Sequence, residues 1–458
     1  MNRAIAALAG GFIVYLVLIY LEGFDFSILV ELLFGTPEDE YSNLHALMLI
    51  IAMMMIVLIS NEAGLFQFIA VKLIIYSNGK PIRLLVIICI LTVIISAILN
   101  NILAVIILIP LTITTSRILN TNPTPYVLTQ AVLVNIGGTM FSISSIPNIL
   151  ITTHAKISFI EYFLFVGLLS IVILFFTLIF FVLLYKKDLF IPKGGAEILR
   201  EFNVWNFVPN KTFLIECMIA FIVLFVMFIV IPPSILSPDI FAWGIAIILM
   251  IISKLNPKEI ISKIDFELIF YLLGIFIITG AFEVLGLAAA LGTAFANLAG
   301  DDILIQILLI LWISAFLSSS IDNIPITKVL IPVIAVMPDD SNNPNKNLKY
   351  YSLAIGANWG DNLTPLGDNI LVINLAEQHK RPIRMRQFFK LGFITTVYQL
   401  AIVSIIFILI FRFFLGIMIV FIILFVILVI YLLHKIGPMK IRQIIDNFAN
   451  KIRNFIIK

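Results

Sequence analysis

Uninterrupted apolar runs of 18 or 19 residues dominate what this chain can fold into. Residues 4–21, 212–230 and 415–433 each carry at most one charged side chain. An α-helix needs about 20 predominantly apolar residues to cross the hydrocarbon layer of a membrane. Hydrophobic residues make up 62% of the sequence and charged residues only 12%, against roughly 45–50% and about 25% in soluble domains. The sequence therefore predicts an all-α polytopic membrane protein.

Basic and acidic side chains gather in different segments of the sequence. The acidic ones concentrate at residues 31–40, 301–302 and 339–340. Lysine and arginine concentrate at residues 72–83, at Arg117, at residues 186–211, 254–263 and 380–390, and in the tail from Lys435. Because cytoplasmic loops carry an excess of lysine and arginine, we expect a multi-pass protein of the plasma membrane with both termini, and Arg3, in the cytoplasm.

Threading the chain to satisfy this charge bias predicts about ten transmembrane helices and two re-entrant hairpins. The spans are predicted near residues 4–22, 44–62, 124–150, 160–185, 212–232, 238–253, 266–285, 350–375, 388–411 and 413–434. Segments 84–119 and 303–337 have like-charged surroundings at both ends, so each is predicted to dip into the membrane as two short helices and return. The apolar spacing beyond Lys435 fits a helix on the inner leaflet or a solvated tail.

The two predicted hairpins align with each other at an offset of 222 residues. The matched pairs are Gly64 and Gly286, Ser96 and Ser318, Asn101 and Asn323, and Pro110 and Pro332. The first copy begins with an inward span and the second with an outward span, so we predict two inverted repeats, which with broken helices are typical of secondary transporters. The expected organisation is an N-terminal helix and external loop (1–43), the first repeat (44–186), a cytoplasmic linker with two helices (187–265), the second repeat (266–411), and a last span with a basic cytoplasmic tail (412–458).

A span rich in glycine and polar residues follows each predicted hairpin, at residues 135–149 and 358–370. Helix-weakening residues interrupt both spans, namely Gly137, Gly138, Pro147, Gly360, Pro365 and Gly367. Irregular backbone at membrane depth is tolerated only where it is buried in protein or lines a cavity. We therefore expect the two hairpin tips and the two broken spans to converge on one polar site.

Over roughly residues 44–411 the chain resembles the ion-transporter superfamily, most closely its branch of arsenite permeases, NhaD antiporters and citrate transporters. Hairpin tips in this branch carry a D-N or S-N pair with proline nine residues after the Asn. The matching tips here are Asn100-Asn101 with Pro110 and Asp322-Asn323 with Pro332. Members also carry a G-G-T-x-T-x-I-G-x-P-P-N-type motif in the broken spans, matched by Gly137-Gly138-Thr139 and Pro147-Asn148. A G-x-x-E-x-x-G-like motif before the second hairpin corresponds to Gly280, Glu283 and Gly286. This chain departs from the pattern at Asn100, where an acid is common, and at Asp361 and Asp368, two unusual acids.

The resemblance implies two inverted repeats with hairpins, a homodimer with a mobile transport domain, and coupling to sodium or protons. The residues expected to bind substrate or ion are Asn100, Asn101, Gly137, Gly138, Thr139, Asn148, Asp322, Asn323, Asn358, Gly360, Asp361, Asn362, Thr364, Asp368 and Asn369. Na⁺ is expected at Asn101 and at Asp322 with Asn323, and Lys328 is expected as a charge partner.

The charged residues inside the second hairpin admit two readings. An aspartate at the centre of a membrane helix costs about 2.5–3.5 kcal/mol on insertion scales, so such groups are functional by default. Asp322 fits a ligand for Na⁺ or a carrier of a proton, or alternatively an ion pair with Lys328 or an N-cap of the following helix. Lys328 fits a cation that neutralises the empty site, a contact with an anionic substrate, or a plain ion pair with Asp322 or Asp361.

The predicted function is a secondary active permease of a small anion or a metalloid oxyanion such as arsenite, working by alternating access coupled to H⁺ or Na⁺. The alternatives are a Na⁺/H⁺ antiporter, a di- or tricarboxylate symporter such as one for citrate, and a channel-like protein. No catalytic motif is present, so we expect no enzyme and no cofactor beyond the coupling ion. The expected partners are the lipid bilayer, the small solute and a second copy of the chain, and not nucleic acid.

Overall fold

The computed structural model of the protein describes residues 2–99, 101–191, 197, 203–300, 302–337, 347–365 and 369–457. The described chain is helical throughout its regular elements and contains no β-strand. Within it, nine helices are long and apolar enough to cross a membrane: Arg3–Tyr20, Ser42–Glu62, Pro81–Ile98, Asn101–Ile118, Phe159–Tyr185, Lys211–Val230, Phe266–Val284, Met385–Phe411 and Phe413–Ile436. The predicted all-α, multi-pass membrane architecture is confirmed.

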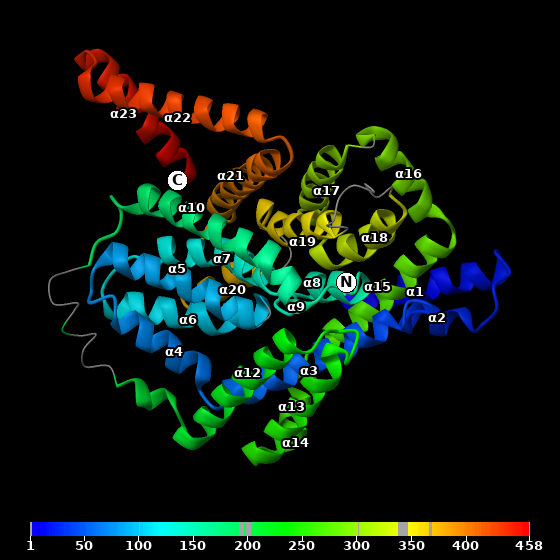
Figure 1. Cartoon of the computed structure of the whole chain (residues 1–458). Helices are drawn as coiled ribbons and strands as arrows, with labels where there is room; N and C mark the ends of the chain where they lie inside the picture. The colour runs from blue at the N-terminus through cyan, green and yellow to red at the C-terminus, as the bar shows by residue number, and fades with distance from the viewer. Residues whose placement is uncertain are drawn as a thin grey trace.

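In the first part of the chain, α4 to α10 lie together, whereas α1 and α2 lie beside α15 (Figure 1). In chain order the helices of this part are α1 (Arg3–Tyr20), α2 (Ile28–Phe34), α3 (Ser42–Glu62), α4 (Leu65–Ile75), α5 (Pro81–Ile98), α6 (Asn101–Ile118), α7 (Thr124–Met140), α8 (Ile146–His154), α9 (Phe159–Tyr162), the π-helical turn η1 (Phe163–Gly167) and α10 (Leu168–Tyr185). The predicted span near 124–150 is therefore two helices, α7 and α8, separated by a break.

The remaining helices include a second broken span. They are η2 (Val204–Phe207), α12 (Lys211–Val230), α13 (Pro238–Ser253), α14 (Pro257–Ser262), α15 (Phe266–Val284), α16 (Leu287–Ala299), α17 (Ile303–Ser318), α18 (Asn323–Val336), α19 (Leu348–Gly360), η3 (Asp361–Leu363), α20 (Asn369–Gln378), α21 (Met385–Phe411), α22 (Phe413–Ile436) and α23 (Met439–Ile457). The predicted span near 350–375 is divided into α19, the 3₁₀ turn η3 and α20.

Helices in the two halves begin at positions 222 residues apart. This holds for α4 and α16, for α5 and α17, and for α6 and α18. Gly64 caps α4 with φ 75° and Gly286 caps α16 with φ 74°. Both glycines adopt the left-handed conformation, which costs other residues steric strain, so the same turn enters each hairpin region.

The two halves also share one packing device between the hairpin and the broken span. A Cβ atom at Gly137 of α7 would lie 2.5 Å from the Val93 carbonyl oxygen of α5, and one at Gly360 of α19 would overlap the backbone of Ala315 in α17. Ser96 Oγ donates to the Val134 carbonyl and Ser318 Oγ to the Ala357 carbonyl, both at 2.6 Å. Glycine therefore brings each broken span into backbone contact with its hairpin.

The segment predicted as the first hairpin, residues 84–119, contains two helices. Helices α5 and α6 have 18 residues each, about 27 Å at 1.5 Å per residue, and they lie side by side (Figure 1). Helix α5 begins three residues before the predicted segment, at Pro81. In the second hairpin α17 has 16 residues and α18 has 14. The re-entrant placement of both hairpins and their inverted orientation stay predictions.

The last two helices differ from the rest in how they pack. Only Gly416 of α22 is buried, and the helix presents large apolar side chains on all sides, a surface suited to lipid. Helix α23 turns back toward α10 and α21 (Figure 1), where Arg453 forms an ion pair with Asp188 and Gln387 Nε2 donates to the Ile457 carbonyl at 2.8 Å.

Candidate functional site

The break after α7 is held open by polar side chains. Ser144 Oγ bonds to the backbone of Phe141 at 2.9 Å, and Ser145 caps α8. Asn148 Nδ2 donates to the carbonyls of Gly138 and Phe141, both at 2.8 Å. Because carbonyls at a helix end lack partners within the helix, these contacts satisfy the backbone that the break leaves free.

The break after α19 uses the same contact. Asn369 Nδ2 donates to the Asp361 carbonyl at 3.0 Å, as Asn148 does at the corresponding point of the first half. Thr364 Oγ1 donates to the Ser319 carbonyl at 2.5 Å, which fixes the break against the tip of the second hairpin.

Asparagine side chains join the two breaks across the halves of the molecule. Asn135 of α7 donates to Asn362 Oδ1 at 2.8 Å, and Asn358 of α19 donates to Asn148 Oδ1 at 2.8 Å. Asn101, at the first hairpin tip, donates to Asn135 Oδ1 at 2.6 Å. The predicted residues Asn101, Asn148, Asn358, Asn362 and Asn369 therefore belong to one buried polar cluster.

The two hairpin tips meet at a small cavity of about 30 Å³, close to the volume of one water molecule in the liquid. Asn101 from the first tip and Asp322 and Asn323 from the second line this tip cavity, together with Ser145 and Arg3. Four helices begin at or beside it: α1 at Arg3, α6 at Asn101, α8 after Ser145 and α18 at Asn323. Helix N-termini carry partial positive charge and favour anions.

Asp322 is the charged residue at the second tip. Its Oδ1 accepts from the Asn323 amide at 2.7 Å, and its Oδ2 accepts from the Tyr271 hydroxyl at 3.4 Å. The guanidinium of Arg3 lies 4.0 Å from the same Oδ2. Asp322 has φ 153° and ψ 154°, a region that residues other than glycine occupy at a cost of about 1–3 kcal/mol, and such strain clusters at functional sites.

Lys328 lies away from the tip cavity. Its Nζ donates to Asn43 Oδ1 at 2.5 Å and lies 5.2 Å from the centre of the Phe276 ring. The expected ion pair with Asp322 or Asp361 is therefore wrong, because the turns of α18 between Asn323 and Lys328 carry the lysine toward the start of α3. Asp322 pairs with Arg3 instead and also caps α18, as one of its two readings predicted.

Other predicted residues have packing or local roles. Gly138 makes room for the Asn101 side chain, Gly137 and Gly360 allow the close helix contacts described above, and Thr139 Oγ1 bonds to the Asn135 carbonyl of its own helix at 2.6 Å. Asp361 is buried beside the second break. Asn100, Asp368 and Gly367 lie outside the described residues.

The buried cluster contains free oxygen acceptors suited to a hard cation. Among the described residues, Asn358 Oδ1 and Asn369 Oδ1 are buried and accept no hydrogen bond. Buried polar atoms are normally satisfied, and neutral oxygens with a carboxylate are the ligands that hard cations take. Within the same residues no cluster of three His, Cys, Asp or Glu side chains could hold a metal ion.

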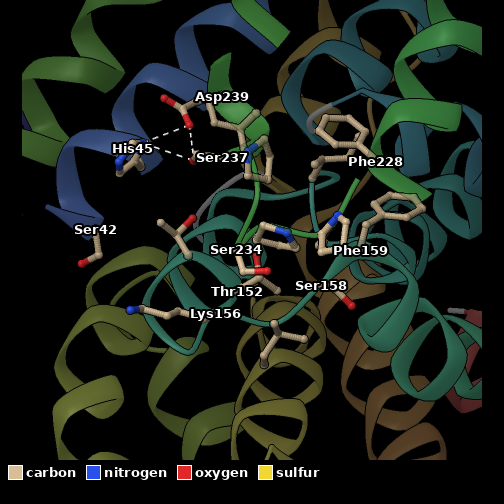
Figure 2. A pocket seen from close by; sticks show the side chains of 18 of the residues that line it. Ser42, His45, Thr152, Lys156, Ser158, Phe159, Phe228, Ser234, Ser237 and Asp239 are labelled. Atoms are coloured by element: carbon tan, nitrogen blue, oxygen red, sulfur yellow. Dashed lines mark hydrogen bonds and ion pairs between the residues drawn. The ribbon is translucent and has the colours of Figure 1, made fainter. Parts of the chain in front are cut away.

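A larger cavity of about 470 Å³ borders the first break at Ser142 and Ile143. We call this cavity the vestibule. Residues from three loops that the sequence places outside the cell line it: 39–42, 152–159 and 231–239. Figure 2 shows His45 beside Asp239 and Ser237; His45 Nδ1 lies 3.0 Å from Asp239 Oδ1. Lys156 Nζ donates to Glu40 Oε1 at 2.6 Å.

The first break connects the vestibule to the tip cavity through shared lining residues. Ile143 lines both the vestibule and a second cavity of about 30 Å³ beside α3. Ser145 and Ile146 line that second cavity and also the tip cavity. The segment 142–147 therefore forms the partition between the vestibule and the hairpin tips.

Sequence reasoning missed three residues of the site. Asn135 stands one helical turn before Thr139 in the quoted polar span, so its position already signalled a role. Arg3 and Tyr271 come from α1 and α15, and no spacing in the sequence indicates that these helices reach the second tip.

Comparison with known proteins gives a consistent assignment. The sequence model of the family described as citrate transporter matches residues 1–349. A 46 kDa membrane protein of Mycobacterium leprae is 29% identical over 371 residues, 79% of this chain and 85% of the relative. An uncharacterized transporter of Mycobacterium tuberculosis is 26% identical over 371 residues, covering 80% and 86%. The human P protein is 25% identical over 445 residues, covering 78% of this chain and 52% of the relative. The chain is a multi-pass membrane transporter and belongs to the citrate transporter family.

Proposed function

We propose that the protein is a secondary active transporter that carries a small polycarboxylate anion of the citrate type together with Na⁺. The observation that supports this best is the meeting of four helix N-termini, those of α1, α6, α8 and α18, at the tip cavity. Positive helix ends arranged around one point favour a multiply charged anion. The printed description of the family supports the choice of a carboxylate.

The carboxylate of Asp322 explains why such a transporter needs a cation. A negative side chain beside an anion site repels the substrate unless a positive charge neutralises it. Na⁺ held by Asp322, Asn323 and Asn101 would supply that charge, and cation and anion would then occupy the cavity together. Asn358 Oδ1 and Asn369 Oδ1 offer further oxygen ligands in the adjoining cluster.

The vestibule gives the substrate a route from outside. Its loops carry acidic residues that the sequence places on the external face, and its floor is the segment 142–147. In this proposal the partition opens toward the vestibule and toward the tip cavity in turn. The protein lies in the plasma membrane, with both termini in the cytoplasm. A homodimer in the lipid bilayer, implied by the family resemblance, completes the proposed assembly.

A metalloid oxyanion such as arsenite is the second candidate substrate. The tip cavity of about 30 Å³ must enlarge for either solute, but less for a small oxyanion than for citrate. If the protein transports Na⁺ without any anion, its function is that of a Na⁺/H⁺ antiporter.

The test is uptake into proteoliposomes. We expect labelled citrate to accumulate several-fold more under an inward Na⁺ gradient than with choline at equal ionic strength, and Asn101→Ala to lower this uptake. Asn206→Ala, an exposed asparagine before α12, is the matched control. Saturable arsenite uptake without citrate uptake would assign the oxyanion, and Na⁺ flux driven by a pH gradient alone would assign the antiporter. Unsaturable flux of every solute would indicate a channel.

A further inference from the structure

The first helix of the chain, which lies outside the two matching halves, supplies a cation to the second hairpin tip. Arg3 Nη1 lies 4.0 Å from Asp322 Oδ2, and the Arg3 guanidinium lies 5.5 Å from the centre of the Tyr271 ring. The Tyr271 hydroxyl donates to the same Asp322 oxygen. Three elements, α1, α15 and the start of α18, therefore place one positive charge at the tip.

Close packing holds Arg3 in this position. A Cβ atom at Gly274 of α15 would overlap the backbone of Ala7, and one at Gly11 would lie 3.1 Å from the Gly274 carbonyl oxygen, so α1 and α15 touch backbone to backbone. Asn2 caps α1 by accepting from the Ala4 amide at 2.8 Å. Because α1 is fixed along α15 and begins at residue 3, its first side chain is directed to the tip cavity.

The two charged groups differ in how far the surrounding protein covers them. The side chain of Arg3 is 38% exposed, whereas that of Asp322 is 11% exposed, and both line the tip cavity. The guanidinium therefore lies on the open side of the carboxylate. A cation that reaches Asp322 from that side must move Arg3 away from Oδ2.

We propose that Arg3 is a tethered cation that neutralises Asp322 when the carrier is empty and competes with Na⁺ for the carboxylate. This inference rests on the proposed function, in which Asp322 binds the coupling ion. A carrier must return empty after it releases its cargo, and an uncompensated buried carboxylate opposes that movement. Arg3 neutralises the carboxylate of Asp322 when no Na⁺ is bound, so the empty carrier can return. It also lowers the affinity for Na⁺, because the guanidinium and the ion compete for Asp322 Oδ2.

The test measures Na⁺ affinity directly. Equilibrium binding of ²²Na⁺ to the purified protein, with ionic strength held constant by choline chloride, compares wild type with Arg3→Gln and Arg3→Lys. A partly exposed ion pair of this kind corresponds to a change in affinity of about threefold to tenfold. We expect Arg3→Gln to bind Na⁺ tighter by that factor and Arg3→Lys to stay near wild type. Arg412→Gln, which removes the ion pair with Asp302 at another site, should leave Na⁺ affinity unchanged.

Transport gives a second readout that a purely structural role would not produce. In proteoliposomes, Arg3→Gln should reach half-maximal uptake at lower Na⁺ and show slower net uptake, because the empty carrier returns slowly. Exchange of external for internal labelled citrate, which needs no empty return, should persist at the wild-type rate. A variant that simply misfolds loses both modes together.

Three results would overturn the inference. They are an unchanged Na⁺ affinity in Arg3→Gln, an equal loss of net uptake and exchange in a variant that still binds Na⁺, and the absence of measurable Na⁺ binding in wild type and variants. Failure of the proposed function looks different, since wild-type proteoliposomes would then take up no carboxylate whatever residue occupies position 3.

Discussion

The two halves of this transporter share a backbone plan and differ in charge. Helices α4, α5 and α6 begin 222 residues before α16, α17 and α18, and the same glycine turn, serine contact and asparagine brace recur in both. The first break and the described part of the first tip are lined by neutral amides and hydroxyls. The second half adds Asp322 at its tip and Asp361 at its break.

This difference distinguishes the residues that hold the helix breaks open from those that the proposed ion coupling requires. Neutral side chains suffice to hold a broken helix open inside a membrane, as the first half shows. Burying a carboxylate carries a cost, and the neutral first half shows that a charge is not required for this task, so the proposed function assigns the charge of Asp322 to ion coupling in addition to its cap of α18. Three predictions test this distinction, beginning with the largest expected effect.

Replacing the charge at the second tip should remove coupling and leave the scaffold intact. Asp322→Asn keeps the shape of the cap but removes the negative charge, and we expect Na⁺-dependent uptake to fall about tenfold to a hundredfold. Asp302→Asn, which changes another helix cap in the same half, is the control in the proteoliposome assay. Wild-type Na⁺ dependence in Asp322→Asn would contradict the assignment of the coupling ion to the charged half.

Closing the glycine contacts should damage both halves equally. We expect Gly137→Ala and Gly360→Ala each to destabilise the protein by roughly 1–3 kcal/mol, because the added methyl group meets backbone atoms of the facing helix. Thermal unfolding followed by size-exclusion chromatography measures this. At Gly244 of α13 an added Cβ meets no atom within 4 Å, so Gly244→Ala should be neutral. A large effect in only one half would break the structural equivalence.

The smallest expected effect is on stability and concerns the ion pair between Glu40 and Lys156 in the vestibule, which lies outside the proposed binding site. The hydrogen bond from Lys156, reinforced by its positive charge, holds the pKa of Glu40 below the usual value. A lowered folded-state pKa stabilises the protein above the unfolded pKa, and this contribution is lost as pH falls through the folded pKa.

The thermal midpoint should therefore drop slightly more for wild type than for Glu40→Gln as pH falls from 6 to 3. Glu38→Gln, in the same loop, should follow wild type. If the thermal midpoints of wild type and Glu40→Gln change identically with pH, the ion pair between Lys156 and Glu40 does not stabilise this region.

Much of the fold could be read from local patterns. Apolar run length predicts the spans, and residues such as Gly64 with Gly286 and Asn101 with Asn323 locate the repeated elements because a turn or a helix start demands them. Contacts between distant helices were not predictable in this way. The contact of Arg3 with Asp322 is an example, since no sequence pattern tells which helix covers the second tip.

The direction in which a side chain points was the second feature that the sequence could not predict. Lys328 is close to Asp322 in sequence, but helix geometry carries it away from the tip to Asn43. Thr139 carries a hydroxyl suited to binding, yet the hydroxyl bonds to its own helix, as threonine commonly does in helices. The orientation of a side chain therefore required the packed structure, because residue type and spacing do not determine it.

The asparagine contacts between the breaks have a mechanical consequence. Asn135 binds the second break and Asn358 binds the first, so neither half can turn alone without rupturing a buried hydrogen bond. In the proposed alternating-access cycle we therefore expect α7 and α19, which carry Asn135 and Asn358, to move together. The proposed opening of segment 142–147 would then have to occur without separating these two helices.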